Sequence, residues 1–255
     1  MKKTGLVILV LLSFLACKKK EKDSDSGSTV PPPVSTPLAP VFFINIPSDA
    51  YGVLMASRFP YTFSNNFVTL KGDASAFFYT APGDYHYVDA GVVKCNDSLL
   101  TKQSSGAYVF NSKAKNGQAT SGTNYSLGSA WSVAGTSGVP AFTYSITNFP
   151  TDAFLTSSIL LNKTAPYIAT FNGASNSDSV VVLLGCDSVM QKQTVSASSG
   201  ICNFTQAQVA SVKKAGSVNK EYINLISYRI QSNTVSGKKY YLVNSNTATY
   251  TVNIQ

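Results

Sequence analysis

The sequence has 255 residues, of which 44% are hydrophobic, 13% are charged and only one is histidine. This aromatic-rich, charge-poor composition excludes a disordered chain, and the length fits one large domain or two domains of ordinary size. With one histidine and four cysteines, the composition also argues against a histidine-based catalytic or metal centre.

The net charge of +8 comes partly from the first 25 residues. Six of the 20 basic residues precede Ser26, which leaves 14 basic and nine acidic residues, a net charge of +5, in the remainder. These later basic residues occur singly or in pairs, without the clustering that nucleic-acid binding requires. We therefore expect no nucleic-acid partner.

The N-terminus has the features of a bacterial export signal. Lys2 and Lys3 precede an apolar run over residues 6–16, and Cys17 follows it. Eleven helical residues span about 16 Å, half of a hydrocarbon core, which favours a cleaved signal over a transmembrane helix. The segment Phe14-Leu15-Ala16-Cys17 resembles the lipobox of bacterial lipoproteins, although leucine is usual where Phe14 stands. This resemblance implies a signal peptide over 1–16, a lipid on Cys17, and attachment to the outer membrane or cell surface.

Residues 17–40 form the predicted tether. The mixed lysine and acidic segment from Lys18 to Gly27 resembles the sorting region of Bacteroidota surface lipoproteins, and a plain hydrophilic tether is the equal alternative. Five prolines between residues 31 and 40 favour extended polyproline II, which would hold the body roughly 40–50 Å from the membrane.

From residue 41 onward, short runs rich in Val, Ile, Tyr, Phe and Thr alternate with Gly, Asn, Ser and Asp clusters. This texture is typical of β-sandwiches. The runs predict strands at Gly52–Phe59, Phe67–Lys71, Ser75–Thr80, Tyr85–Asn96, Ala107–Asn111, Ser129–Ala134, Ala141–Thr147, Ala165–Asn172, Ser179–Leu184, Met190–Val195, Ile201–Phe204, Glu221–Gln231, Lys238–Asn244 and Ala248–Ile254.

One short helix is expected among these strands. Thr205 and Gln208 fit a capping box, an apolar stripe follows, and Gly216 supplies a stop signal. In the last predicted strand, Tyr250, Val252 and Ile254 share one face. We expect this face to be buried and the opposite face of the strand to be exposed to solvent.

A proline at position 150 divides the body into two halves of about seven strands each. The sequence therefore predicts an all-β fold with two immunoglobulin-like β-sandwich domains, at 41–148 and 149–255. Residues 235–244, together with 131–133 and 140–144, resemble uncharacterised Bacteroidota cell-surface lipoproteins with immunoglobulin- or fibronectin-type domains. That family has no established activity, so the resemblance implies fold and location alone.

Three cysteines remain in the body. Cys186 ends a predicted strand and Cys202 begins one, so a disulfide between them and two buried thiols are equal alternatives in an exported protein. Closing that loop would stabilise the fold by about 3 kcal/mol. Cys95 is expected to be a core thiol, and the spacing of the cysteines does not predict a zinc site.

Four tyrosines are the candidate ligand contacts: Tyr85, Tyr87, Tyr240 and Tyr241. If they converge on one exposed face, they would suit stacking against sugars. Asp84 and His86 lie on one side of a strand, but two ligands do not make a metal site, so no metal is expected. A lone tryptophan in a sandwich favours a core position for Trp131.

These features favour a lipid-anchored envelope protein with a non-catalytic binding or scaffolding role and no cofactor. Its partners would be the membrane, through the lipid, and a glycan or another envelope protein. The sequence contains no GxSxG or HExxH motif. The alternatives are a surface glycan-binding lipoprotein and an acidic-residue hydrolase, which would need two facing carboxylates.

Three Asp-Ser-hydrophobic steps, with acceptors Ser98, Ser179 and Ser188, resemble protein O-glycosylation sites of the Bacteroidota. Turns that precede strands explain the same residues. If glycans are attached, the intact mass of protein purified from its native host will exceed that of the chain plus its lipid. A mass equal to the lipoprotein alone would contradict this prediction.

Overall fold

The computed structural model describes residues 43–62, 68–110, 125, 128–186, 189–212 and 221–255. Signal peptide, Cys17 and tether lie outside the described residues. The predicted all-β class is confirmed, because nearly all regular structure in the described part is strand.

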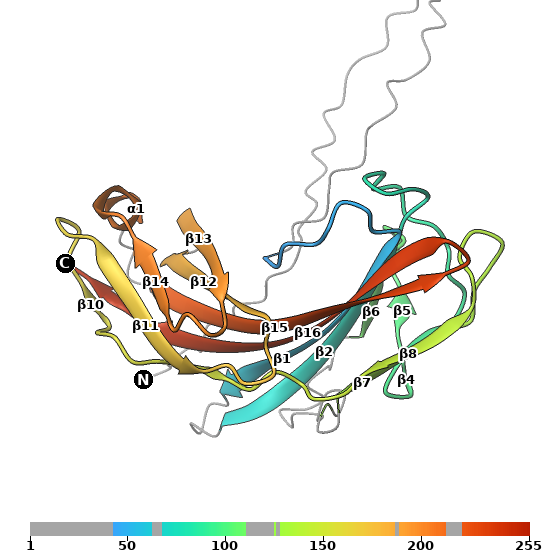
Figure 1. Ribbon diagram of the computed structural model, residues 1–255, viewed down its shortest axis with the longest axis horizontal. Helices are drawn as coiled ribbons and strands as arrows, with labels where there is room; N and C mark the ends of the chain where they lie inside the picture. The colour runs from blue at the N-terminus through green and yellow to red at the C-terminus, as the bar shows by residue number, and fades with distance from the viewer. Residues whose placement is uncertain (1–42, 63–67, 111–124, 126–127, 187–188, 213–220) are drawn as a thin grey trace, which may run out of the picture. The chain divides into compact units, whose positions relative to one another are not determined.

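An eight-stranded sheet is the framework of the body (Figure 1). The central pair β1 and β16 is parallel and the other neighbours are antiparallel. Across the sheet the order is β13 (Val189–Ser196), β12 (Ser179–Cys186), β15 (Tyr222–Val235), β16 (Lys238–Thr251), β1 (Gly52–Thr62), β2 (Val68–Phe78), β6 (Tyr108–Phe110) and β5 (Thr101–Lys102).

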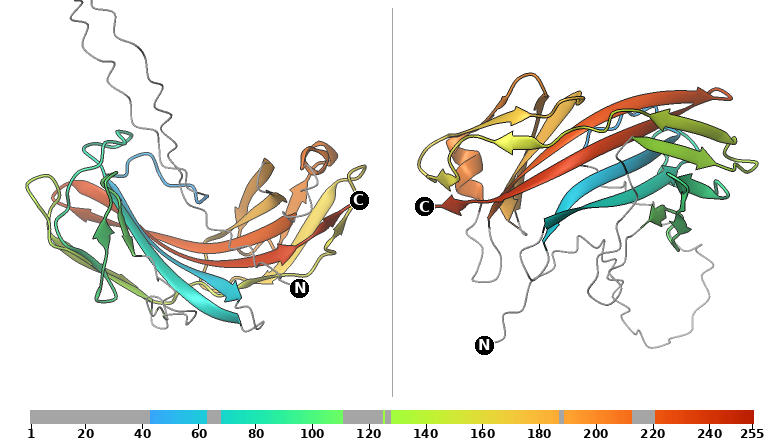
Figure 2. Two further views of the ribbon diagram at one scale, coloured as in Figure 1. Left: turned by 180° about the vertical axis from the view of Figure 1, so that it is seen from behind. Right: turned by 90° about the horizontal axis from the view of Figure 1, so that it is seen from below.

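Three smaller sheets and one helix complete the described structure. The four-stranded sheet contains β4 (Ser98–Leu99), β3 (Val93–Cys95), β7 (Ser129–Val133) and β8 (Phe142–Ile146). The three-stranded sheet contains β14 (Ile201–Phe204), β11 (Tyr167–Gly173) and β9 (Ala153–Leu155), and a two-stranded sheet joins β10 (Leu160–Leu161) to β17 (Asn253–Ile254). The small four-stranded and three-stranded sheets lie toward opposite ends of the β15–β16 hairpin (Figure 2).

Two hydrophobic cores lie on one face of the large sheet. In the N-terminal core, Leu54 and Leu242 pack with Trp131 of the four-stranded sheet, which confirms the predicted core position of the tryptophan. In the C-terminal core, Leu184 and Leu225 pack with Phe204. Because side chains alternate along strands, the residues next to these, such as Val53 and Val243, point to the opposite face and form a third cluster.

The short helix α1 (Gln206–Ser211) has the predicted capping box. The Thr205 hydroxyl accepts from the Gln208 amide at 3.2 Å, while the Gln208 side chain accepts from the Thr205 amide at 2.9 Å. Val209 fixes the helix in the C-terminal core. The predicted stop at Gly216 lies outside the described residues.

The predicted boundary near residue 148 divides neither the large sheet nor the N-terminal core, whereas the described residues of the C-terminal core all come from the second half. β16 belongs to the second half, yet its Tyr240 and Leu242 lie in the N-terminal core, and it pairs with β1 from the first half. Residues 39–255 accordingly form one compact unit. The two halves therefore share their largest sheet instead of each closing a separate sandwich.

Several predicted strand boundaries are wrong. Residues 238–244 and 248–254 were expected as two strands, but β16 runs to Thr251 because Ser245 and Asn246 are buried in the sheet and do not form a turn. Phe67–Lys71 and Ser75–Thr80 likewise merge into β2. Of Tyr85–Asn96, only Val93–Cys95 is a strand, since Asp89 accepts from the Gly91 amide at 2.8 Å and Gly91 has a φ of 71°.

A two-residue turn sets the register of the β15–β16 hairpin. Ser236 and Gly237 have φ values of 50° and 76°, the conformation of a type I′ turn. This turn matches the right-handed twist of the strands that it joins, so 14 residues of each strand can pair without a break.

A layer of buried polar groups, which we call the seam, lies between the two cores. Its members are Ser129, Ser227, Asn244 and Asn246, each at most 2% exposed. The Ser129 hydroxyl donates to Asn244 Oδ1 at 2.6 Å. Ser227 and Asn246 donate to the carbonyl oxygens of Thr151 and Pro150 at 2.7 and 3.3 Å. The seam thus holds the chain where it crosses from one core to the other.

Replacing Ser129 with alanine should lower the free energy of unfolding by about 1–3 kcal/mol, because the buried Asn244 oxygen would lose this donor. Urea denaturation measures the change. Ser132→Ala, at an exposed position of the same strand, is the control and should change stability by no more than about 0.5 kcal/mol. Equal effects of the two substitutions would contradict a stabilising role for the seam.

Candidate functional site

Residues 43–50, which we call the strap, cover the face of the large sheet opposite to the two cores (Figure 1). The strap follows the predicted tether directly and has no regular secondary structure. Its Ile44 and Ala50 are buried against the sheet residues Val53, Val181 and Val243. Burial of these apolar side chains is the main force that seats the strap.

Polar contacts reinforce both ends of the strap. Lys192 Nζ donates to Asn45 Oδ1 at 3.0 Å. At the other end, Tyr241 donates to Asp49 Oδ1 at 2.6 Å and Lys239 Nζ lies 3.0 Å from Asp49 Oδ2. The hydrogen bonds from Tyr241 and Lys239 lower the pKa of the Asp49 carboxyl. Asp49 therefore favours its charged form when the strap is seated.

A pocket of about 410 Å³ opens between the strap and the sheet. Val53 and Tyr79 come from the sheet side, Gly83 and Tyr85 from the loop that follows β2, and the strap supplies the remaining wall. The lining residues are Ile44, Asn45, Ile46, Pro47, Ser48, Ala50, Val53, Tyr79, Gly83 and Tyr85. We call this the strap pocket.

Aromatic rings form one side of the strap pocket. The ring of Tyr79 stacks on Tyr87 and meets Tyr85 edge-on, both with centroids 5.8 Å apart. Tyr79 is 4% exposed, and its hydroxyl has no hydrogen-bond partner among the described residues. Burial raises the pKa of this hydroxyl, so it is neutral at physiological pH. Tyr85 is 37% exposed.

The four predicted contact tyrosines do not all converge. Tyr85 lines the strap pocket and Tyr87 packs beside it. Tyr241 is on the same face of the sheet, where it holds Asp49. Tyr240 points the other way and is buried in the N-terminal core against Phe142, with ring centroids 4.8 Å apart. Neighbouring residues of a strand cannot share a face, which excludes a joint role for Tyr240 and Tyr241.

Sequence reasoning missed the strap and Tyr79. The strap lacks a helical or strand period. The alternation of Ile44, Asn45 and Ile46 after a proline-rich segment could nevertheless have indicated a segment that packs against the body. Tyr79 was included in a predicted strand without a separate role. Phe77 and Tyr79 share the face that packs against Tyr87, which alternation along that strand predicts.

The loop that carries Tyr85 and Tyr87 is held by two aspartates. Asp84 Oδ1 accepts a hydrogen bond from the His86 amide at 3.1 Å and also contacts His86 Nδ1, and these bonds lower the pKa of Asp84. Among the described residues, no group of three or more His, Cys, Asp or Glu side chains could hold a metal ion. The two contacts between Asp84 and His86 hold this turn of the loop.

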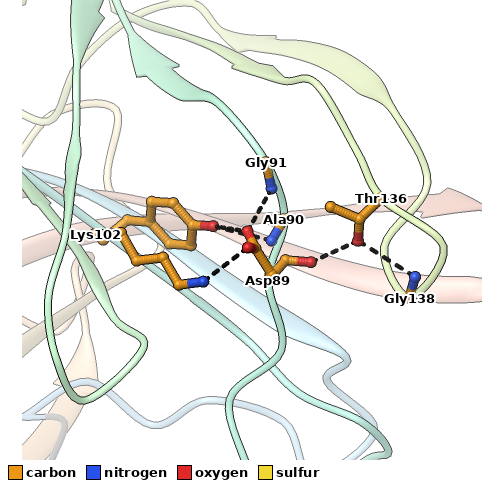
Figure 3. Close-up of polar contacts among 7 residues, drawn as sticks. Asp89, Ala90, Gly91, Lys102, Thr136 and Gly138 are labelled. Carbon is orange, nitrogen blue, oxygen red and sulfur yellow. Dashed lines mark hydrogen bonds and ion pairs between the residues drawn. The ribbon is translucent and has the colours of Figure 1, made fainter.

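Asp89 fixes the far end of this loop (Figure 3). Its carboxylate lies 2.8 Å from Lys102 Nζ and accepts from the Tyr108 hydroxyl at 2.6 Å. Its carbonyl accepts from Thr136 Oγ1 at 2.6 Å. The hydrogen bond from Lys102 is the largest cause of a strongly lowered pKa of Asp89, while burial raises the pKa of Tyr108 to about 12. Asp89 thus joins the loop to two neighbouring segments of the first half.

The body cysteines are buried. Cys95 lies in the N-terminal core, as predicted, and burial raises its pKa to about 12. Cys202 is a free thiol in the C-terminal core whose pKa burial raises to about 11. Of the two alternatives for Cys186 and Cys202, the structure therefore has two buried thiols and no disulfide between them.

The candidate glycosylation sites and the anchor have different positions. Ser98 and Ser179 are half-buried in β4 and β12, and Asp178 Oδ2 accepts from the Ile230 amide at 2.8 Å. Ser188 and Cys17 lie outside the described residues. Within the described ranges, the structure contains no helix with the length and apolar character needed to span a membrane.

Replacing Asp49 with asparagine should weaken the seating of the strap near neutral pH. Because the pKa of Asp49 is lowered in the folded state, its stabilising contribution exists above the ordinary Asp pKa of about 3.9 and disappears as pH falls through the folded value. Wild type and Asp49→Asn should therefore differ in stability at pH 6 and converge toward pH 2 in urea denaturation.

Ser48→Ala, in the same strap, is the matched control and should follow the pH dependence of the wild type. A difference between wild type and Asp49→Asn that stays constant over this pH range would contradict the role assigned to the Asp49 charge.

The described lining of the strap pocket therefore comes entirely from the first half, between Ile44 and Tyr85, whereas strands of both halves seat the strap. Its geometry is the evidence for function in this chain. No protein-family model matches the sequence, and no curated protein has a similar sequence.

Proposed function

We propose that this protein is a lipid-anchored bacterial envelope protein, attached through Cys17, whose body binds a ligand non-catalytically in the strap pocket. The observation that carries the proposal is the pocket itself, whose volume of about 410 Å³ lies in the range of small-molecule sites. The lipobox-like segment 14–17 and the tether over 17–40 support the anchoring. The outer membrane or cell surface is the proposed location.

The chemistry of the lining favours binding over turnover. The described lining consists of apolar, aromatic, glycine, serine and asparagine residues and includes no carboxylate, imidazole, lysine or arginine. General acid-base catalysis needs a titratable group within hydrogen-bond reach of the substrate, and the described lining offers only the tyrosines Tyr79 and Tyr85, of which Tyr79 has a pKa raised by burial. Rigid walls and few polar groups are instead typical of a pocket that recognises a ligand.

The finer fold assignment belongs to the same proposal. A small sheet from each half, 41–148 and 149–255, covers a core on the large sheet, and the N-terminal core also includes Phe149, Tyr240 and Leu242 from the second half. This layering supports a relation of each half to an immunoglobulin-like sandwich in which the large sheet is shared. The proposal also includes the resemblance to Bacteroidota surface lipoproteins with immunoglobulin- or fibronectin-type domains.

Glycan binding is the second candidate function. It is favoured by the exposed ring of Tyr85, which lies beside Tyr87 and Tyr79 and could stack on a sugar. Against it, the described pocket lining offers few hydrogen-bonding side chains, whereas a sugar carries a hydroxyl on most of its carbons.

Substitution of Cys17 by alanine should move the protein from the membrane fraction to the soluble fraction of its native host, because lipid chains contribute about 0.8 kcal/mol per buried methylene. Immunoblotting after a carbonate wash measures this shift. Cys202→Ala, a second cysteine substitution in the body, should leave the protein with the membranes. If Cys17→Ala also stays there, the lipid anchor is refuted.

A further inference from the structure

We propose that the outer face of the three-stranded sheet, formed by β14, β11 and β9, is the surface through which two copies of this chain form a weak dimer. The inner face of this sheet covers the C-terminal core, and its strands lie at the end of the body that carries the C-terminus (Figure 1). The outer face shares no residue with the described lining of the strap pocket. It therefore gives the protein a partner in addition to the ligand of the proposed function.

The outer face presents one large apolar side chain from each strand. Phe154 on β9, Ile168 on β11 and Ile201 on β14 are 53%, 52% and 41% exposed. Ile201 is opposite Thr170 of β11 and therefore diagonal to Ile168. Phe154 is opposite Asn172 on the other side of β11. A single exposed apolar side chain is ordinary on a protein surface, whereas several on one sheet face are typical of an interaction site.

The fold itself does not require this apolar face. The four-stranded sheet covers the N-terminal core in the same way, yet its outer face carries Lys94, Ser132 and Thr143 in one exposed row across three strands. The exposed apolar residues of that sheet, Val92 and Leu99, lie beside Lys94. Since a covering sheet folds with a polar and charged outer row, the apolar row on the three-stranded sheet indicates burial against a partner.

The outer face carries no charge among its described side chains. These outward side chains are Phe154, Thr156, Ile168, Thr170, Asn172, Ile201 and Asn203. The hydroxyls of Thr156 and Thr170 lie 2.9 Å apart and hydrogen-bond with each other. A partner recognised by its charge would gain nothing here. Two copies of this chain, each with 14 basic and nine acidic residues after residue 25, can meet through this face without bringing like charges into contact.

The positions of the three apolar side chains suit a twofold axis that runs along β11 between the two copies. Because β9 and β14 flank β11, such an axis places β9 of each copy over β14 of the other. Phe154 of one copy then packs against Ile201 of the second copy, and Ile168 meets Ile168. Each apolar residue thus meets an apolar residue, so the face is complementary to itself, as a twofold interface requires. Two sheets packed face to face are about 10 Å apart, a gap that side chains of this size fill.

The size of the face predicts a weak dimer. Three strands about 4.8 Å apart and seven residues of about 3.4 Å each give a face of roughly 14 by 24 Å, so two copies would bury roughly 700 Å² in total. Stable interfaces bury at least about 1,200 Å², and smaller ones belong to transient complexes. We therefore expect a dissociation constant on the order of 100 μM. Under the proposed anchoring, attachment to one membrane would raise the local concentration of the two copies.

Sedimentation equilibrium tests the dimer in residues 17–255 with Cys17→Ala, a form that keeps the tether and the whole body and lacks only the predicted signal peptide. Between about 5 and 500 μM, the mean molar mass should rise from that of one chain toward that of two. The molar mass of one chain throughout this range would overturn the proposal.

Substitution of Ile168 by lysine places two like charges at the twofold axis and should raise the dissociation constant at least about tenfold. Ser132→Lys is the matched control, because it adds the same charge at an exposed position on the outer face of the four-stranded sheet. Its dissociation constant should stay within about twofold of that of the wild type. Loss of the dimer in both variants, or in neither, would overturn the proposed surface.

Ile168→Glu tests the axis itself. Alone, this variant should be monomeric, because two carboxylates meet at the axis. An equal mixture with Ile168→Lys should form dimers again, because opposite charges then face each other. A mixture that associates no more than either variant alone would overturn the proposed arrangement. Phe154→Ser, which removes an exposed ring without adding a charge, should weaken the dimer about three- to tenfold, and it tests the same face if position 168 does not tolerate a charge.

Phosphatidylcholine vesicles test a lipid surface as the other occupant of an uncharged apolar face. In a flotation assay, the same soluble form should not bind these vesicles. Vesicle binding that Ile168→Lys removes would assign the face to a lipid surface and overturn the proposed dimer.

Discussion

The pairing of β16 with β15 on one side and with β1 on the other is the interaction on which the described body depends. Side chains of β16 enter all three clusters: Leu242 the N-terminal core, Tyr250 the border of the C-terminal core, and Val243 the face beneath the strap. Register along this strand therefore decides which residues reach which cluster. A slip of one residue would exchange Leu242 with Val243 and expose each core to the wrong set of side chains.

The seam explains how one sheet can support two cores. Asn244 and Asn246 are buried on the face that carries the cores, where apolar residues would have joined the cores into one. Instead, they bind Ser129 and the carbonyl of Pro150, so the crossing backbone meets hydrogen-bonding groups where it passes over the sheet. Arg58 adds to this junction, since its guanidinium lies 4.3 Å from the centroid of the Phe149 ring and also donates to the Tyr125 carbonyl. The seam is only partly satisfied, because Asn244 Nδ2 and Asn246 Oδ1 have no hydrogen-bond partner among the described residues, so its hydrogen bonds set the path of the chain at a cost in stability.

Local patterns in the sequence predicted the local structure well. The capping box at Thr205 and Gln208 and the alternation at Tyr250, Val252 and Ile254 need only neighbouring residues, and both are confirmed. The merging of two predicted strands into β16 could not be predicted, because Ser245 and Asn246 resemble turn residues until their partners are known. One of these partners, Ser57 on β1, lies 188 positions away, with its hydroxyl 2.9 Å from that of Ser245.

The candidate site was the least predictable part for the same reason. Tyr85 and Tyr87 are candidates because they alternate on one face of a predicted strand, whereas Tyr240 was misplaced because its partner Phe142 lies far away in sequence. The pocket wall is an irregular segment whose position is set by Val53, Val181 and Val243, three residues on three different strands. The contact of the strap with these three strands cannot be predicted from sequence periodicity, because it exists only once the sheet has assembled.

The strap connects the anchoring and the binding parts of the proposed function. Its polar contacts, from Lys192 and Lys239, lie at the surface and contribute little individually. Seating therefore depends on the small apolar area of Ile44 and Ala50. A ligand in the pocket would touch both the strap and the sheet. A ligand that binds only when the strap is seated stabilises the seated form, and this stabilisation grows as the ligand concentration rises above the dissociation constant. Under the proposed function, ligand binding in the pocket and the seating of the strap on the sheet are thus coupled through the eight residues of the strap.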